Sequence, residues 1–166
     1  MFRKLIATRE DYSAFVIRVV LGAVMLPHGL QKLFGLFGGY GFQATVAFFS
    51  AKLGIPQPLA ALVILAESLG ALALVFGLVG RFAAFGVAAT MVGAVLMVHG
   101  HNGFFMNWNG NQAGEGFEYH LLALAMAAAV MIRGSGALSL DRLIQRRAGT
   151  PEAQGFDVTP RPAVTA

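Results

Sequence analysis

The sequence contains no cysteine and few charged residues, and these two shortages set the first limits on the protein. Without cysteine, the chain can supply no thiol–disulfide chemistry, no thiolate ligand to a metal and no cysteine nucleophile. Charged residues make up 12% of the chain and hydrophobic residues 57%, whereas a typical soluble domain has about 25% charged residues. The composition therefore indicates a chain that is solvated largely by lipid.

The formal net charge of +4 is the one feature that could indicate a nucleic-acid partner. Nucleic-acid-binding domains gather their basic residues into a patch or stripe. Here the lysines and arginines lie at the edges of apolar segments and form no continuous patch. We therefore predict no nucleic-acid partner and interpret the basic residues as signals of membrane topology.

The apolar residues are concentrated in four blocks, each near the length of about 20 residues with which a helix crosses a bilayer. The blocks cover residues 12–34, 59–79, 82–98 and 117–133. The fourth is the weakest, because Glu118, Tyr119 and His120 occupy its first turn. The pattern predicts an all-α fold in which residues 1–147 form a bundle of four transmembrane helices in a lipid bilayer.

Basic residues flank these blocks unevenly. One side carries Arg3, Lys4, Arg9, Arg81, Arg133, Arg142, Arg146 and Arg147, and the other carries only Lys32 and Lys52. Because lysine and arginine accumulate on the cytoplasmic side of membrane proteins, we predict that both termini are cytoplasmic. Arg18 interrupts the first block and no small-residue cleavage site follows, so we expect this block to stay in the mature protein and not to be a cleaved signal peptide.

The segments outside the blocks are of three kinds. Between the first and second blocks, apolar residues recur at helical spacing at Phe42, Val46, Phe49 and Leu53, which predicts a short helix on the outer membrane interface. Residues 134–147 begin with a glycine break and continue as a short amphipathic segment that we expect to lie on the cytoplasmic head groups. Residues 148–166 lack periodicity, and we predict a disordered tail.

Two ionisable residues lie well inside the apolar blocks. Charged groups inside a membrane are costly and require a partner, a watery cavity or a function. We predict an intramembrane ion pair between Arg18 and Glu67, in which Glu67 carries protons or contacts a ligand. Two structural alternatives stay open: a pair that only fixes helix register, or an Arg18 side chain that extends to the lipid head groups.

Histidines and carboxylates gather toward the outer half of the predicted bundle. In the first block, His28, Gln31 and Lys32 share one helical face because of their spacing. Adding the polar residues of the other blocks gives a candidate pocket of His28, Lys32, Glu67, His99, Glu118 and His120. Such a titratable pocket is suited to binding a small polar head group or to relaying protons.

Two other interpretations of the outer cluster stay open. One is a metal site with ligands drawn from His99, His101, Glu115, Glu118 and His120, although their spacing matches no specific metal motif. The other is a hydrogen-bonded outer cap in which Trp108 and Tyr119 act as interfacial aromatic residues. No haem, flavin or iron–sulfur motif accompanies these residues.

Five stretches of the chain resemble the DoxX family of small bacterial membrane proteins. They are residues 28–35 (HGLQKLFG), 66–70 (AESLG), 99–108, 114–120 (GEGFEYH) and 136–141 (GALSLD). The resemblance implies a four-helix membrane bundle in the bacterial inner membrane. It also implies a link to redox systems, because relatives are described as subunits or partners in thiosulfate:quinone oxidoreduction and as quinone-responsive proteins.

These observations give two hypotheses of function. The first is an inner-membrane component of a redox or quinone-linked system, an oxidoreductase subunit whose outward-facing pocket exchanges protons with a bound quinone while a partner subunit handles electrons. The alternative is a noncatalytic membrane assembly or a small-solute transport module. A single four-helix chain has little room for a pore, so transport would require a homo-oligomer.

Overall fold

The computed structural model describes residues 2–148, and this range is helical with no strand. The elements are α1 (Phe2–Ile6), α2 (Tyr12–Phe34), η1 (Leu36–Gly38), α3 (Gly41–Leu53), α4 (Gln57–Leu65), η2 (Ala66–Gly70), α5 (Ala71–Phe76), α6 (Gly80–Met97), η3 (His99–Asn102), α7 (Glu118–Arg133) and α8 (Leu140–Arg147). The all-α prediction is confirmed. The predicted disordered tail lies, from residue 149 onward, outside the described residues.

Three helical segments are long and apolar enough to cross a membrane. They are Tyr12–Phe34, Gln57–Phe76 and Gly80–Met97, and the first has the bounds predicted from the sequence. The fourth predicted span corresponds to α7, which has 16 residues and is therefore about 24 Å long at 1.5 Å per residue. Because polar residues occupy its first turn, its apolar part is shorter than the other three, and a fourth span stays a prediction.

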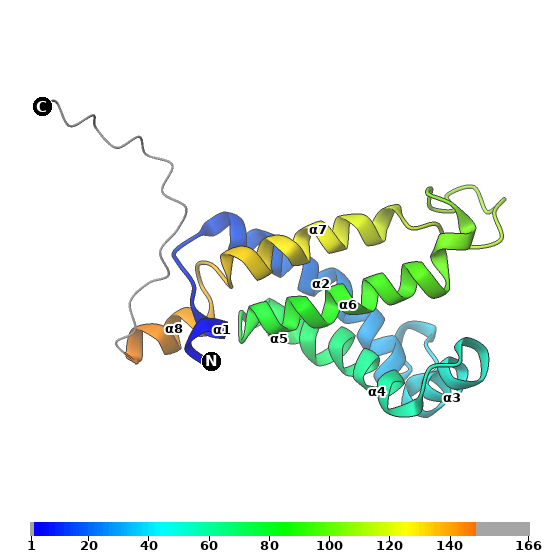
Figure 1. The fold of residues 1–166 in the computed structure, drawn as a ribbon, viewed down its shortest axis with the longest axis horizontal. Helices are drawn as coiled ribbons and strands as arrows, with labels where there is room; N and C mark the ends of the chain where they lie inside the picture. Colours follow the sequence, from blue (N-terminus) through cyan, green and yellow to red (C-terminus); the bar gives the residue numbers. More distant parts are fainter. Residues whose placement is uncertain (1, 149–166) are drawn as a thin grey trace, which may run out of the picture.

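The bundle has a core of small and medium apolar side chains. Helix α7 packs along α6 and α2, and α2 packs against α5 and η2, as Figure 1 shows. Leu21, Met25, Leu74, Val87, Met91 and Val130 are among the buried core residues. Many large apolar side chains elsewhere are exposed, such as Phe82 and Leu122, which fits a bundle whose outer surface contacts hydrocarbon.

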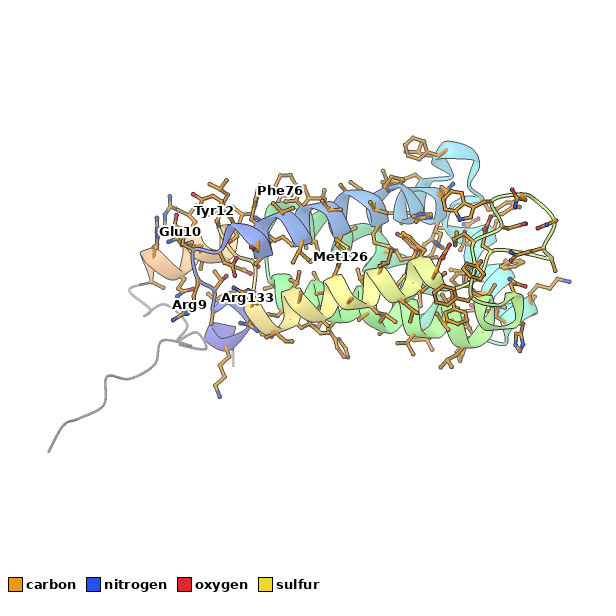
Figure 2. The ribbon with its side chains drawn as sticks, turned by 90° about the horizontal axis from the view of Figure 1, so that it is seen from above. Arg9, Glu10, Tyr12, Phe76, Met126 and Arg133 are labelled. Carbon is orange, nitrogen blue, oxygen red and sulfur yellow. The ribbon has the colours of Figure 1, made fainter. Side chains whose placement is uncertain are left out.

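The two ends of the bundle differ in structure and charge. Helices α1 and α8 and the N-terminus lie at one end, while α3 and the loop from η3 to α7 lie at the other (Figure 1). Figure 2 shows Arg9, Glu10 and Arg133 at the α8 end. We call the other end the α3 end. The basic residues predicted to lie on one side of the membrane, including Arg81 and Arg142, thus belong to the α8 end.

Arg18 does not pair with Glu67, and this corrects the ion pair predicted from the sequence. Its guanidinium uses all five N–H donors on backbone carbonyl groups near the α8 end. The acceptors are Ser135 (2.5 Å), Leu74 (2.7 Å), Val75 (2.6 Å), Ala137 (3.2 Å) and Leu138 (2.8 Å). Arg18, which is 0% exposed, thus donates inside the protein to carbonyl groups at the end of α5, where intrahelical donors run out, and to the backbone of residues 135–138.

Asp141 joins the turn between α5 and α6 to the segment between α7 and α8. Its carboxylate accepts hydrogen bonds from the backbone N–H groups of Val79 (2.7 Å) and Gly80 (3.0 Å) and from the Ser135 hydroxyl (2.5 Å). The Asp141 N–H donates to the Gly77 carbonyl. The stretch 136–141, which carries part of the family resemblance, therefore has a structural role at the α8 end.

Outside the spans, the structure has helix α3 where the sequence predicts a short helix, helix α8 where it predicts a short amphipathic segment, and helix α1, which it does not predict. Helix α3 lies between the first two spans and packs on α2 and α4, and α8 follows the glycine break after α7. Their positions at membrane interfaces stay predictions. Helix α1 precedes the first span, where five residues are too few to give a periodic signal, and it packs on α6 and α8.

Candidate functional site

The Lys32 side chain forms an ion pair with the Glu67 carboxylate in the half of the bundle toward the α3 end. Lys32 lies near the end of α2, and Glu67 lies in η2, a π-helical turn inside the second span. The Glu67 side chain is 6% exposed and that of Lys32 is 26% exposed. The carboxylate is therefore buried among apolar helices, and Lys32 connects it to a less enclosed region.

The π-helical turn and one glycine bring the two residues together. Single π-helical turns inside α-helices are rare and occur often at functional sites. Helix α2 approaches this turn so closely that a Cβ atom on Gly29 would lie 2.4 Å from the Glu67 carbonyl oxygen and 2.5 Å from the Ser68 Cα. Only glycine fits there, so Gly29 sets the distance between α2 and η2.

A cavity of about 270 Å³ opens beside Lys32, between α2 and α3. We call it the aromatic cavity; its lining residues are Gln31, Lys32, Gly38, Gly39, Tyr40, Thr45, Phe48 and Phe49. Thr45 is buried, whereas Tyr40 and Phe48 are exposed. The cavity therefore combines an aromatic mouth with an ammonium group whose partner carboxylate lies deeper in the bundle.

Polar rings continue from this pair into the bundle. The rings of His28 and Tyr119 have centroids 6.3 Å apart, and both residues lie within electrostatic range of Glu67. The Tyr119 hydroxyl donates a hydrogen bond to the Met25 sulfur at 3.4 Å. Tyr119 thus lies between helix α2 and the two histidines His99 and His120.

His99 and His120 form the next part of this series. Their ring centroids are 4.2 Å apart, and His99 Nδ1 lies 2.8 Å from the Glu115 carbonyl oxygen. His120 is buried, and its Nδ1 has no hydrogen-bond partner among the described residues. Because buried polar atoms are normally hydrogen-bonded, this nitrogen is available to a ligand, a water molecule or a proton.

Five of the six predicted pocket residues form one group with Tyr119 toward the α3 end, and of these six residues only Lys32 lines the aromatic cavity. We call this group the outer polar chain; its members are His28, Lys32, Glu67, Tyr119, His120 and His99. Glu118, the sixth predicted residue, instead accepts hydrogen bonds from the Met106 N–H (2.9 Å) and from Trp108 Nε1 (3.3 Å). Its carboxylate holds the loop that covers the α3 end.

The residues suggested as metal ligands do not come together as a metal site. No group of three or more histidine or acidic side chains within the described residues is arranged to hold a metal ion. His101 is exposed, and a Glu115 carboxylate oxygen accepts from the Asn107 N–H at 2.6 Å. The geometry thus gives the metal interpretation no support, because Glu115 and Glu118 are both used to order the loop.

The sequence predicts neither the aromatic cavity nor the place of Tyr119 in the outer polar chain. The helical spacing of apolar residues predicts α3 and places Phe49 on its apolar face. The same spacing does not predict which helix that face contacts. The contact with α2 depends on the turn at residues 35–41, where Gly35, Gly38 and Gly41 adopt positive φ angles. Such a turn is not predicted by hydrophobic periodicity.

This arrangement suits ligand binding with proton exchange. The ammonium of Lys32 can donate to an oxygen of a ligand in the aromatic cavity, and aromatic rings at the mouth can stack on a flat ring. A buried carboxylate and several imidazoles can take up or release protons.

Comparison with known proteins identifies a family and a curated relative. Over 134 residues, which cover 81% of this chain and 88% of the relative, the chain is 28% identical to the Bacillus subtilis (strain 168) protein named "Putative oxidoreductase CatD". No solved structure matches the chain. The DoxX family model matches residues 13–100, which is more than half of the chain and includes Lys32, Glu67 and His99. The chain therefore belongs to the DoxX family.

Proposed function

We propose that this protein is an inner-membrane component of a bacterial redox system and that a quinone-type head group binds in its aromatic cavity. The observation that carries the proposal is that Lys32, which lines that cavity, forms an ion pair with the buried Glu67. A relative named as an oxidoreductase supports the redox setting. The pair provides a hydrogen-bond donor and a proton acceptor next to a site with aromatic walls.

The size of the cavity fits a head group without its tail. Small-molecule pockets have volumes of about 300–1,000 Å³, and the aromatic cavity, at about 270 Å³, lies just below that range. The isoprenoid tail would leave past the exposed side chains of Tyr40 and Phe48 and lie in the lipid. The flat quinone ring would stack against the aromatic side chains, with one carbonyl oxygen accepting a hydrogen bond from Lys32.

The outer polar chain would handle the protons. Reduction of a quinone to a quinol takes up two electrons and two protons, and oxidation releases them. The protons would pass between the head group and the α3 end through Glu67, His28, Tyr119, His120 and His99. The sequence has no haem, flavin or iron–sulfur motif, so the electrons would be exchanged with a partner redox protein.

The same proposal includes the topology. Helix α7 would be the fourth span, with the loop that Glu118 and Trp108 order at the outer membrane interface and α3 beside it. The concentration of lysine and arginine at the α8 end supports a topology with both termini in the cytoplasm. The aromatic cavity would then open toward the outer half of the bilayer, where a membrane quinone can enter it laterally.

A titration tests the proposal. The full chain, purified in detergent, is titrated with a short-tailed quinone in a calorimeter, and the Lys32→Met and Glu67→Gln variants are compared with Lys52→Met, which removes an exposed lysine of α3. We expect saturable binding that the first two variants weaken at least tenfold and that Lys52→Met leaves unchanged. Binding that is absent, or equal in all four proteins, would favour the noncatalytic assembly or transport alternative.

A further inference from the structure

Thr45 occupies the most buried position of α3. Among the described residues of this helix it alone is buried, at 5% exposure. The buried positions of a helix that packs on one side are normally apolar, and Val46 and Phe49 beside it follow that rule. A hydroxyl at such a position needs a hydrogen-bond partner or a function, because buried polar atoms are normally hydrogen-bonded.

The Thr45 hydroxyl has no hydrogen-bond partner among the described residues. Hydroxyl side chains inside helices often donate to the carbonyl group four residues earlier. Two buried hydroxyls of the spans do so, from Ser68 to Ile64 (2.7 Å) and from Thr90 to Gly86 (3.1 Å). Thr45 makes no such bond within its helix. Because it lines the aromatic cavity and its oxygen is not enclosed by protein, the hydroxyl faces that space.

The aromatic cavity therefore has a polar group on each of its two helical walls. Lys32 lies on the α2 wall and Thr45 on the α3 wall, and the two helices pack on each other. Phe48 and Phe49 follow Thr45 by three and four residues, which places them on the same side of α3. Their ring centroids are 6.3 Å apart. A flat ring lying against these two side chains would present one edge to each polar group.

We propose that Thr45 is the second hydrogen-bond contact of the head group and that the cavity selects rings with two oxygen atoms at opposite positions, as in a para-quinone. This inference rests on the proposed function, because it takes the aromatic cavity as the quinone site. The Lys32 ammonium can only donate, whereas a hydroxyl can donate or accept. Thr45 would donate to a quinone carbonyl and accept from a quinol hydroxyl, so both oxidation states keep two contacts.

The unpartnered hydroxyl gives Thr45 a signature that a purely structural residue would not have. Valine has the shape of threonine without the hydroxyl, so Thr45→Val removes the contact with the ligand but no hydrogen bond inside the protein. The affinity should fall, while the stability of the ligand-free protein should be kept or raised, because a buried polar group without a partner is costly. A hydroxyl that held α3 in place would instead lower the stability when removed.

Calorimetric titration and thermal unfolding of the full chain in detergent test the inference. The ligands are a short-tailed para-quinone and the alkylphenol with the same tail, which carries a single ring oxygen. Thr45→Val is compared with Thr45→Ser, which keeps a hydroxyl. The matched control is Ser50→Ala, which removes a hydroxyl of α3 that donates to the Ile55 carbonyl at 2.9 Å and does not line the cavity.

We expect Thr45→Val to weaken quinone binding roughly fivefold, the value of one hydrogen bond, without a loss of stability. Thr45→Ser should retain most of the affinity. Ser50→Ala should leave the affinity unchanged and lower the stability. The alkylphenol should bind more weakly than the quinone, and Thr45→Val should not change its affinity, because its one oxygen lies at Lys32.

Four results would overturn the inference. Equal quinone affinity in the wild type and Thr45→Val, with Lys32→Met still weakening it, would exclude Thr45 as a contact and leave the proposed quinone site in place. A loss of stability in Thr45→Val would assign the hydroxyl to the packing of α3. An equal loss of affinity for both ligands would show a general disturbance of the cavity. Absence of quinone binding in every protein would remove the proposed function and this inference with it.

Discussion

The Lys32 ammonium and the Glu67 carboxylate form an ion pair where α2 meets the π-helical turn η2. The carboxylate is buried, and the ammonium borders the aromatic cavity. A buried charge that loses its partner is strongly destabilising, whereas a pair replaced as a unit by apolar residues often is not. Comparing single and double replacements of Lys32 and Glu67 therefore distinguishes the contribution of the pair to stability from its proposed role in binding.

Removing one partner of this pair should cost more stability than removing both. We expect Lys32→Met to lower the free energy of unfolding by about 3 kcal/mol, and the double variant Lys32→Met/Glu67→Leu to recover most of that loss without recovering quinone binding. Unfolding in mixed detergent micelles measures both, with Lys52→Met as the control. Additive losses in the double variant would mean that the two side chains do not stabilise each other.

The approach of α2 to η2 depends on Gly29. A Cβ atom there would lie 2.4 Å from the Glu67 carbonyl oxygen, so Gly29→Ala must push the two segments apart. We expect a loss of about 1–3 kcal/mol in stability together with weaker quinone binding. Gly93→Ala on α6 is the matched control, because a Cβ atom there meets no atom within 4 Å. Equal effects of both substitutions on unfolding would contradict the close approach.

Arg18 should be irreplaceable by lysine at the α8 end. Lysine has three N–H donors where arginine has five, so at least two of the five carbonyl groups that Arg18 binds would lose their partner. A buried unsatisfied group costs about 1–3 kcal/mol, and we expect Arg18→Lys to lower the stability by about that amount per group. Quinone affinity, measured on the folded fraction, should not change. A loss of affinity with unchanged stability would instead place Arg18 in the binding site.

The contact between Glu10 and α8 should make the α8 end sensitive to acid. The hydrogen bond from Arg142 lowers the pKa of Glu10 below its ordinary 4.5, burial opposes that shift, and the charges of Arg142 and Arg146 add to it. Because the folded-state pKa is the lower one, this contact stabilises the protein fully above pH 4.5 and progressively less as the pH falls through the folded-state value.

Melting temperatures of the wild type and Glu10→Gln, measured from neutral pH to below 4.5, test this dependence. The wild type should be the more stable protein at neutral pH, and the difference should shrink toward zero in acid. A difference that is independent of pH would mean that the Glu10 charge contributes nothing.

The sequence predicts the long helices well and the polar contacts poorly, for a physical reason. Hydrophobic length alone defines α2 and α6, and the spacing of Phe42 and Phe49 indicates α3. The partner of Arg18, however, depends on the chain reversal at Gly77 and on the backbone of residues 135–138, none of which gives a periodic signal. The sequence places Glu67 inside a membrane span, but it does not predict the π-helical turn in which Glu67 lies and from which it pairs with Lys32.

Photoreactive quinone, cross-linked to the full chain in membranes and located by peptide mass spectrometry, tests whether a quinone head group binds in the aromatic cavity beside Lys32. We expect labelling of residues 31–49 that excess unlabelled quinone abolishes and that Glu67→Gln strongly reduces. Labelling confined to other segments, or labelling of 31–49 that unlabelled quinone does not reduce, would contradict that binding.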